Sequence, residues 1–285
     1  MISERGLGPA RRPIAGGSGF SFRVRVWLTW VVLAAAVVIA CRAMHLDMAY
    51  VRSKLPFLLG VELAPDGFIQ GAALTIFVTA CSMVFALGVA LITALGRLSR
   101  NPIAFAIATF YASFFRGTPL LVQVLIIYLA LPQIGLVLGG LTSGVMALSL
   151  NYGAYLAETI RGGLIAVPAG QRDAARALGL PRWVIAWKVI MPQALRFIIP
   201  PAGALFISML KDSSLVSLMG LWELNFLAQS YARSTYRYME MLLAAAIIYW
   251  GLSIVFEIVQ MRLEARFGRG AEAEAGFAEG PRNRP

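Results

Sequence analysis

The chain has 285 residues, of which 59% are hydrophobic and only 14% are charged, and its mean hydropathy is +0.74. Soluble domains are about half apolar and about a quarter charged, so this composition excludes an ordinary soluble domain and indicates a membrane protein. The net charge of +11 does not indicate a nucleic-acid partner, because the basic residues lie between apolar stretches and form no basic soluble module.

Six apolar stretches are long enough to cross a bilayer, which requires about 20 consecutive, mostly apolar residues. The first follows a basic tail of residues 1–25 and is separated from the second by a loop of residues 45–67. It also loosely resembles a lipoprotein signal ending at Cys41, although the 25 residues before it are long for a signal. The six predicted spans cover residues 26–44, 68–96, 102–131, 139–161, 192–220 and 239–261.

The third span contains Arg116, followed by Gly117-Thr118-Pro119. Proline lacks an N–H group and disfavours helical backbone at the residue before it. We therefore expect the helix to break at Thr118 and to leave backbone groups free. Irregular backbone at membrane depth is tolerated where it lines a cavity or is buried in protein, so the break predicts a cavity.

The basic residues predict how the chain is oriented, because cytoplasmic loops are enriched in Lys and Arg. With the N-terminus inside, 18 of the 25 Lys and Arg residues lie in inside segments. We therefore expect both termini in the cytoplasm, with residues 262–285 forming a charged and disordered tail. The outside segments hold Arg42, Arg52, Lys54, Arg233 and Arg237, and the spans themselves hold Arg116 and Lys211.

An ionisable side chain within a span is costly and therefore a candidate for function. Arg116 and Asp212 are each expected about 22–24 Å above the inner surface, counting 1.5 Å per residue from the inner ends of their helices. We predict that Arg116 binds the α-carboxylate of an amino acid and that Asp212 binds its α-ammonium. The alternative is that the two residues pair with each other, within one chain or between two subunits. Glu158 is expected to pair with Arg161 near the inner end of its span, and Lys211 has no assigned role.

The loop of residues 164–192 is predicted to contain two short helices on the cytoplasmic face. The first ends at Gly179, and the second runs from Arg182 to Ile190 before Pro192 interrupts it. Its alanines, tryptophans and basic residues suit either a knob that docks on a partner or an amphipathic loop that rests on lipid headgroups.

A spacing pattern within this loop resembles that of a known family. Asp173-Ala174-Ala175 is followed after three residues by Gly179 and after nine more by Val189-Ile190-Met191-Pro192. This resembles the EAA loop of ABC importer permeases, E-A-A-x3-G-x9-I-x-L-P, with substitutions that keep the charge sign or the apolar character. Four further segments resemble the polar amino-acid branch of that family: Tyr111 to Gln123, Asn151 to Glu158 with Arg161-Gly162-Gly163, Pro192 to Arg196, and Lys211 to Ser217.

The resemblance implies an all-α membrane bundle with the type I ABC importer permease fold, with a core of residues 68–261 and an additional first helix. It implies docking of the loop on a cytoplasmic ATPase, a second permease subunit of the same or a related chain, a periplasmic substrate-binding protein, and location in the bacterial inner membrane. The coupling residues that it implies are Gln171, Asp173, Ala174, Ala175, Gly179 and Pro192.

The expected function is thus that of a permease subunit for a polar amino acid, which catalyses no covalent reaction. The phosphate-binding pattern G-x-x-x-x-G-K-[ST] is absent, so ATP is expected on a partner and no cofactor on this chain. His45 has no second metal ligand at a suitable spacing, and no metal is expected. The alternative function is an ion-coupled secondary carrier with Asp212 or Glu158 as proton carrier, which leaves the EAA pattern unexplained.

Overall fold

The computed structural model describes residues 22–43, 46–64 and 67–268, which form helices and, besides them, one isolated bridge between Gly71 and Glu223. The chain divides into two units, Met1–Asp47 and Met48–Pro285. His45, the side chain of Cys41 and most of both predicted tails lie outside the described residues.

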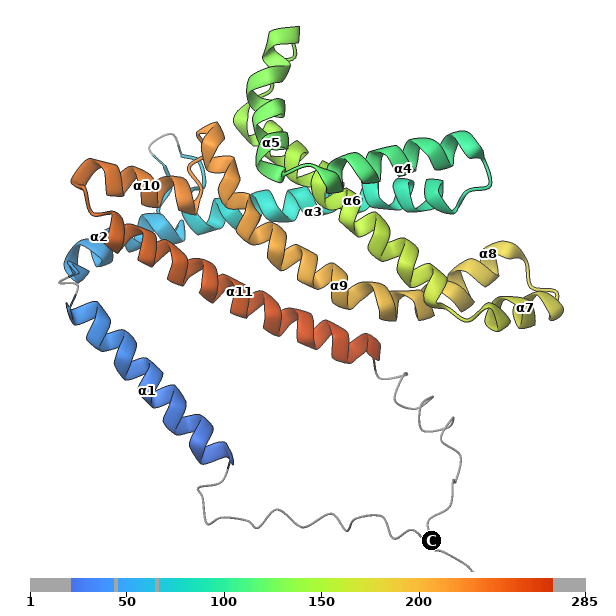
Figure 1. The fold of residues 1–285 in the computed structure, drawn as a ribbon, viewed down its shortest axis with the longest axis horizontal. Helices are drawn as coiled ribbons and strands as arrows, with labels where there is room; N and C mark the ends of the chain where they lie inside the picture. Colours follow the sequence, from blue (N-terminus) through green and yellow to red (C-terminus); the bar gives the residue numbers. More distant parts are fainter. Residues whose placement is uncertain (1–21, 44–45, 65–66, 269–285) are drawn as a thin grey trace, which may run out of the picture. The chain divides into compact units, whose positions relative to one another are not determined.

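The larger unit is a bundle of helices joined by short turns (Figure 1). π-helical turns lie at Ile126–Ala130 and Ile185–Ile190, and 3₁₀ turns lie at Leu131–Ile134 and Ser213–Met219. Its α-helices are α2 (Met48–Leu59), α3 (Gly71–Leu98), α4 (Pro102–Gly117), α5 (Leu120–Leu125), α6 (Gly140–Ala166), α7 (Ala169–Ala177), α8 (Arg182–Val184), α9 (Met191–Asp212), α10 (Leu224–Thr235) and α11 (Tyr238–Gly268).

Three helical stretches of the described chain are long and apolar enough to cross a membrane: Gly71–Leu98, Arg182–Met219 and Tyr238–Arg266. A fourth is the pair Pro102–Gly117 and Leu120–Ile134, which is bent by 105°. Helix α6 has 27 residues but is not among these apolar helices, because it carries polar residues such as Asn151 and Glu158; it lies at the centre of the bundle and buries much of its surface against protein. The predicted helical membrane bundle is therefore confirmed.

Small side chains allow α3 and α6 to pack closely at the centre of this bundle, as is common between membrane helices. The Oγ of Ser149 in α6 donates a hydrogen bond to the carbonyl oxygen of Ser82 in α3, at 3.1 Å. A Cβ atom on Gly163 would approach Ile198 to 2.4 Å, so this glycine brings α9 against α6. The buried face of α3 consists of Gly71, Ala72, Thr75, Val78, Thr79, Ser82, Ala86, Ala90, Thr93 and Ala94.

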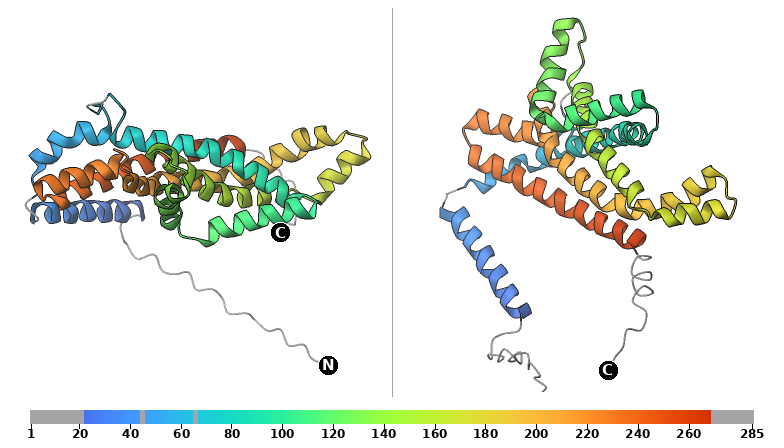
Figure 2. Two further views of the ribbon diagram at one scale, coloured as in Figure 1. Left: turned by 90° about the horizontal axis from the view of Figure 1, so that it is seen from above. Right: turned by 45° about the vertical axis from the view of Figure 1, so that its right-hand side comes forward.

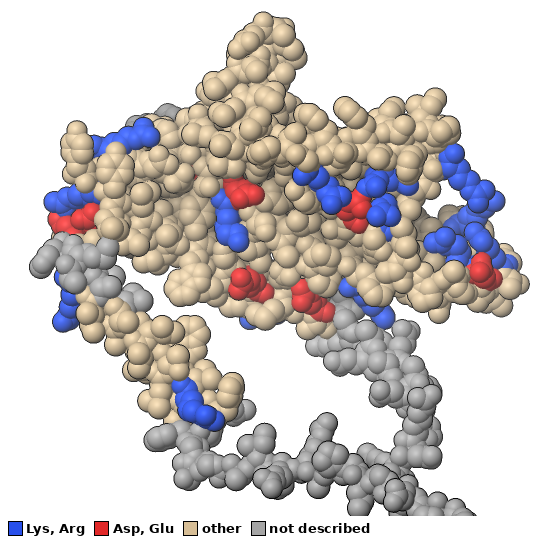
Figure 3. Space-filling view, in the orientation of Figure 1, with Lys and Arg blue, Asp and Glu red and all other residues tan. Residues whose placement is uncertain are grey.

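The two ends of the larger unit differ (Figure 2). Helices α7 and α8 project at one end, where Lys and Arg side chains gather (Figure 3). Helices α2 and α10 lie at the opposite end and pack against α11. The segment 45–67, predicted as a loop, thus contains a helix, and α10 was not predicted. Helix α11 continues beyond the predicted end at Met261 to Gly268, so the start of the predicted tail is helical.

A fully buried carboxylate, that of Glu223, holds this end together. It caps α10 by accepting hydrogen bonds from the backbone N–H groups of Phe226, at 2.7 Å, and Asn225, at 2.9 Å. It also accepts from the Tyr249 hydroxyl of α11, at 2.8 Å, and from Thr75 of α3, at 3.4 Å. One side chain therefore connects three helices.

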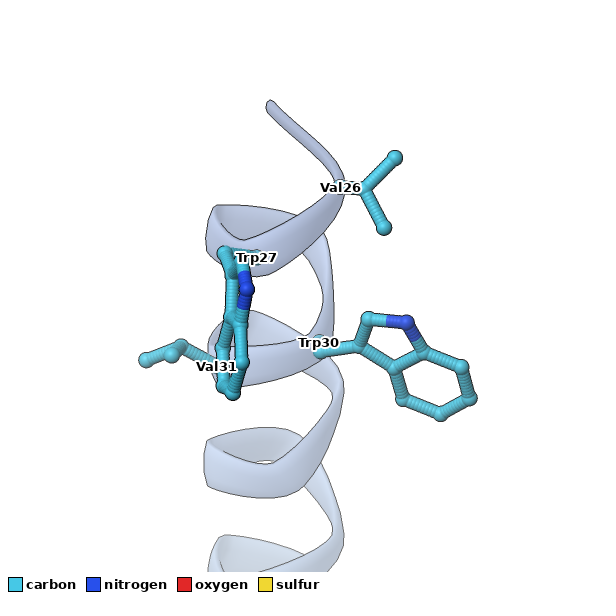
Figure 4. A pocket seen from close by; sticks show the side chains of 4 residues that line it. All are labelled: Val26, Trp27, Trp30 and Val31. Carbon is cyan, nitrogen blue, oxygen red and sulfur yellow. The ribbon is translucent and has the colours of Figure 1, made fainter. Parts of the chain in front are cut away.

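The smaller unit contains α1 (Phe22–Ala43), which covers the first predicted span. Val26, Trp27, Trp30 and Val31 line an open hollow on its surface (Figure 4). Trp27 is 73% exposed and Trp30 is 61% exposed. Tryptophans near one end of an apolar helix are typical of the interface between lipid tails and headgroups.

Burial raises the pKa of Glu223 to about 7, even though its hydrogen-bond donors favour the charged form. Because this pKa lies above the ordinary value for a glutamate, protonation of Glu223 favours the folded state. This contribution to the free energy of unfolding is fully present below about pH 4.5 and is lost as the pH rises through about 7. We predict that the detergent-solubilised protein loses about 1.4 kcal/mol of stability from Glu223 between pH 6 and pH 8.

Thermal melting of the variant Glu223→Gln tests this prediction. Its melting temperature should be lower at both pH values, because an amide nitrogen cannot accept from the N–H groups of α10. The decrease between pH 6 and pH 8 should also become smaller than in the wild type. A variant that keeps the full pH dependence would contradict the assignment to Glu223.

Candidate functional site

The predicted break in the third span lies where it was expected. Helix α4 ends at Gly117, Thr118 has an extended backbone with φ −113° and ψ 145°, and α5 begins after Pro119. The helix begins regularly, since the Asn101 side chain accepts hydrogen bonds from two backbone N–H groups of its first turn. The break is therefore local to the Gly-Thr-Pro sequence.

Two buried amides satisfy the backbone groups that the break leaves free. The Gln123 side chain donates to the carbonyl oxygens of Phe115, at 2.9 Å, and Thr118, at 3.1 Å. Asn151 of α6 donates to the same Phe115 oxygen, at 3.0 Å, and to the Gln123 side-chain oxygen, at 3.1 Å. This network fixes the broken helix against α6. Neither amide was predicted as a functional residue. The signal that could have found them is an amide side chain within an apolar span, such as Gln123 shortly after the Gly-Thr-Pro break.

Arg116, the last basic residue of α4, points to Glu158 of α6. Its Nη1 lies 3.7 Å from Oε1 of Glu158, and its guanidinium lies 5.5 Å from the centre of the Tyr155 ring. Glu158 also contacts Arg97 of α3 and, at 2.9 Å, Arg161. The predicted pair between Glu158 and Arg161 is present, but two further arginines share the same carboxylate. Three guanidinium groups thus face one carboxylate, which leaves an excess of positive charge.

Asp212, at the end of α9, has a different partner. Its Oδ2 accepts a hydrogen bond from the Tyr152 hydroxyl, at 2.7 Å. No ion pair joins Asp212 to Arg116 within this chain, so the predicted alternative of a pair locking one chain is wrong. A pair between two subunits stays a prediction.

Arg116 and Asp212 nevertheless line the same cavity, which has a volume of about 510 Å³. Binding sites for small molecules usually enclose about 300–1,000 Å³. The wall carries both apolar and polar groups, with Tyr155 and Leu205 beside Thr118 and Ser208. The Arg116 side chain is 42% exposed, so it can be reached by a solute. The cavity can therefore offer opposite charges to a zwitterion.

The helix turn at Gly179 follows a defined backbone motif. Gly179 has φ +71°, its N–H donates to the Arg176 oxygen at 2.9 Å, and the N–H of Leu180 donates to the Ala175 oxygen at 3.2 Å. This is the Schellman arrangement, in which glycine takes the left-handed position that ends a helix. The predicted glycine stop of α7 is present.

The other residues of the predicted coupling loop have different environments. Asp173 and Ala174 are exposed, and Asp173 pairs with Arg176 at 3.4 Å, whereas Ala175 is buried. Gln171 accepts a hydrogen bond from Gln193, at 3.4 Å, which connects α7 to the start of α9. The most exposed apolar groups at this end are Leu178, Trp183 and Trp187.

The prediction that Pro192 interrupts the second short helix is wrong. Helix α8, the π-helical turn Ile185–Ile190 and α9 are continuous, and Arg182–Met219 forms one helical stretch of 38 residues. Proline lacks an N–H group and collides with the carbonyl group four residues earlier in a regular helix. The π-helical turn directly before Pro192 widens the helix there and accommodates the ring.

Comparisons with known proteins agree with this arrangement. The model of the family described as "Binding-protein-dependent transport system inner membrane component" matches residues 86–269. The L-cystine transport system permease protein TcyB of Bacillus subtilis is 40% identical over 201 residues, covering 70% of this chain and 86% of that protein. The arginine transport system permease protein ArtQ of Bacillus subtilis is 33% identical, covering 78% and 98%.

Solved structures show the same fold. A crystal structure of an amino acid ABC transporter with histidines is 36% identical, has a TM-score of 0.68, and covers 77% of this chain and 97% of its own. The MetNI methionine ABC transporter is 19% identical with a TM-score of 0.58, covering 68% and 92%, and supports the fold alone. The chain therefore belongs to the family of binding-protein-dependent transport system inner membrane components, and it is the permease subunit of an amino-acid ABC importer and not an enzyme.

Proposed function

We propose that this permease carries a polar amino acid through the cavity between α4, α6 and α9. Arg116 binds the α-carboxylate through its guanidinium fork, and Asp212 binds the α-ammonium. The observation that carries the proposal is that both residues line one cavity without pairing with each other. The related permeases named for glutamine, cystine and arginine support this class of solute.

The charge balance beside the cavity supports the role of Arg116. Glu158 cannot fully neutralise three guanidinium groups, so Arg116 keeps an attraction for a second carboxylate. Asp212 keeps hydrogen-bonding capacity, because a carboxylate has two oxygen atoms and Tyr152 engages one of them. An amino acid would thus supply the missing partner of each group.

The cytoplasmic end is proposed to dock on the ATPase. The docking surface consists of α7 and α8, with Gln171, Asp173, Ala174, Ala175, Gly179 and Pro192 as the coupling residues. Exposed Leu178 and Trp183 supply an apolar contact, and tryptophan and arginine are common anchors of protein interfaces. The basic surface around α7 and α8 and the 18 inside Lys and Arg residues support a cytoplasmic position, with both termini inside.

The complete importer is proposed to contain a second permease subunit, two ATPase subunits and a periplasmic binding protein, assembled in the bacterial inner membrane. ATP-driven closure of the ATPases moves α7 and α8 in this proposal. That movement opens the cavity to one side of the membrane and closes it to the other. The chain itself binds no ATP in this mechanism.

The solute site is tested by Arg116→Gln and Asp212→Asn in proteoliposomes that contain the whole importer. Each variant should lower the uptake of labelled glutamine, arginine or cystine at least about tenfold, because each removes a charge-assisted hydrogen bond. The control is Arg100→Gln, which removes an exposed arginine near the other end of α4. If the variants assemble normally with their partners but lose uptake, the solute site is supported. If the complex no longer assembles, Arg116 and Asp212 pair between two subunits instead.

The docking surface is tested by a pair of glycine variants. Gly179→Ala forces alanine into φ +71° and re-directs α8, whereas Gly135→Ala imposes a comparable strain, at φ +87°, in the turn after Leu131–Ile134, outside the docking surface. Neither added methyl group meets an atom within 4 Å. Gly179→Ala should reduce co-purification of the ATPase severalfold, while Gly135→Ala should not. Equal co-purification of the ATPase with both variants would refute docking through this turn.

A further inference from the structure

A second cavity, of about 380 Å³, lies between the 3₁₀ turn Ser213–Met219 and α10. It shares no lining residue with the cavity of Arg116 and Asp212. It lies toward the end of the bundle opposite α7 and α8, which is the outer end in the proposed orientation. Its polar groups come from Ser217, Gln229, Ser230 and Arg233.

Arg233 supplies an uncompensated positive charge to this cavity. Its Nη2 donates to the Gln229 side-chain oxygen, at 3.2 Å, and no described carboxylate lies within 4.0 Å of its guanidinium. Phe226 also lines the cavity, on the same face of α10 and seven residues before Arg233, and Trp222 stacks on Phe226 with ring centres 6.3 Å apart. The cavity therefore combines a carboxylate-binding group with an apolar ring, as an amino acid requires.

A row of polar residues leads from this cavity toward the inner one. Side chains three residues apart lie in line on a 3₁₀ helix, so Ser214 and Ser217 form one row, which ends at the cavity beside Gly220. Lys211 lies one turn before the row, next to Asp212 in sequence. Over Ser213–Met219 the chain rises about 14 Å at roughly 2.0 Å per residue.

Helix α10 runs beside this row and holds it in place. The Asn225 side chain donates to the Ser214 carbonyl oxygen and to the Ser217 Oγ, both at 3.3 Å. Ser217 belongs to both the row and the second cavity. The polar row is thus continuous with the cavity that contains Arg233.

We propose that the second cavity is an outer receiving site, where Arg233 binds the α-carboxylate of an arriving amino acid before it passes along the row to Arg116 and Asp212. Lys211, at the inner end of the row, attracts the same carboxylate between the two cavities. The inference rests on the proposed function, because the inner cavity is the destination. A carboxylate could also come from an acidic side chain of the binding protein, and the experiment separates these sources.

The experiment uses the complete importer in nanodiscs with 5-fluorotryptophan, whose Trp222 resonance is assigned with Trp222→Phe. Titration with free L-glutamine and free L-arginine, without binding protein, should shift this resonance for at least one of them. The half-saturating concentration should rise about tenfold or more in Arg233→Gln. It should not change in Arg52→Gln, which removes an exposed arginine of α2 outside the cavity. The α-amides, which lack the carboxylate, should not produce the shift.

An unshifted resonance with both amino acids, or equal titrations of wild type and Arg233→Gln, would overturn the receiving site. A second outcome would also overturn it. If Arg233→Gln left the amino-acid titration unchanged but raised the half-saturating concentration of binding protein in ATPase stimulation, Arg233 would contact the binding protein and not the amino acid. Arg116→Gln separates this inference from the proposed function. It should abolish uptake but leave the Trp222 titration unchanged, whereas normal uptake in Arg116→Gln would refute the inner site alone.

Discussion

The structure depends on one constraint, which is that polar groups inside a membrane bundle must find their partners within the protein. The break at Thr118-Pro119 exposes carbonyl oxygens that no water in a lipid environment could satisfy. Gln123 and Asn151 satisfy them and thereby fix α4 and α5 against α6. Arg116 is the residue directly before this fixed point. Its position in the cavity is thus a consequence of how the break is satisfied.

The same constraint explains the composition of the helices around the cavity. Apolar packing cannot by itself draw helices together in lipid, so α3 and α6 use small residues and hydrogen bonds such as that from Ser149 to Ser82. Glu223 performs a comparable role at the other end, where it connects α3, α10 and α11 through four donors. At the two cavities, by contrast, Arg116 shares one carboxylate with two other arginines, and Arg233 has no described carboxylate within 4.0 Å. Polar groups that are satisfied within the protein hold the scaffold, whereas Arg116 and Arg233 are the groups that the two proposed sites use.

Local sequence signals predicted much of this arrangement. They failed where the structure depends on contacts between residues that are far apart in the sequence. The Gly-Thr-Pro break and the glycine stop at Gly179 depend on a few adjacent residues, and the structure contains both. Of the six predicted spans, the described chain contains three helices that are long and apolar enough to cross a membrane, or four if the bent pair after Pro102 counts as one span. The pair of Glu158 and Arg161 was predicted from their spacing of three residues on one helix, whereas Arg97 and Arg116 come from α3 and α4, so no spacing in the sequence indicates that they join this carboxylate. Helix α10 was missed because its stability comes from the cap at Glu223 and from packing, since the segment is short and mixed in polarity. Pro192 was misread because the π-helical turn that accommodates it has no sequence pattern of its own.

The uninterrupted helix from Arg182 to Met219 has a mechanical consequence. It carries Trp183 and Trp187 at one end and Asp212 toward the other, so the proposed ATPase contact and the proposed solute contact belong to one continuous stretch of 38 residues. This stretch bends where α8 and the π-helical turn join α9 (Figure 1), and α9 itself contains Pro200 and Pro201. Gly163 lets α9 pack directly against α6 at Ile198, between those two ends. Movement of α7 and α8 would therefore reach Asp212 through the backbone of one helical stretch, without any relay of side chains between the two sites.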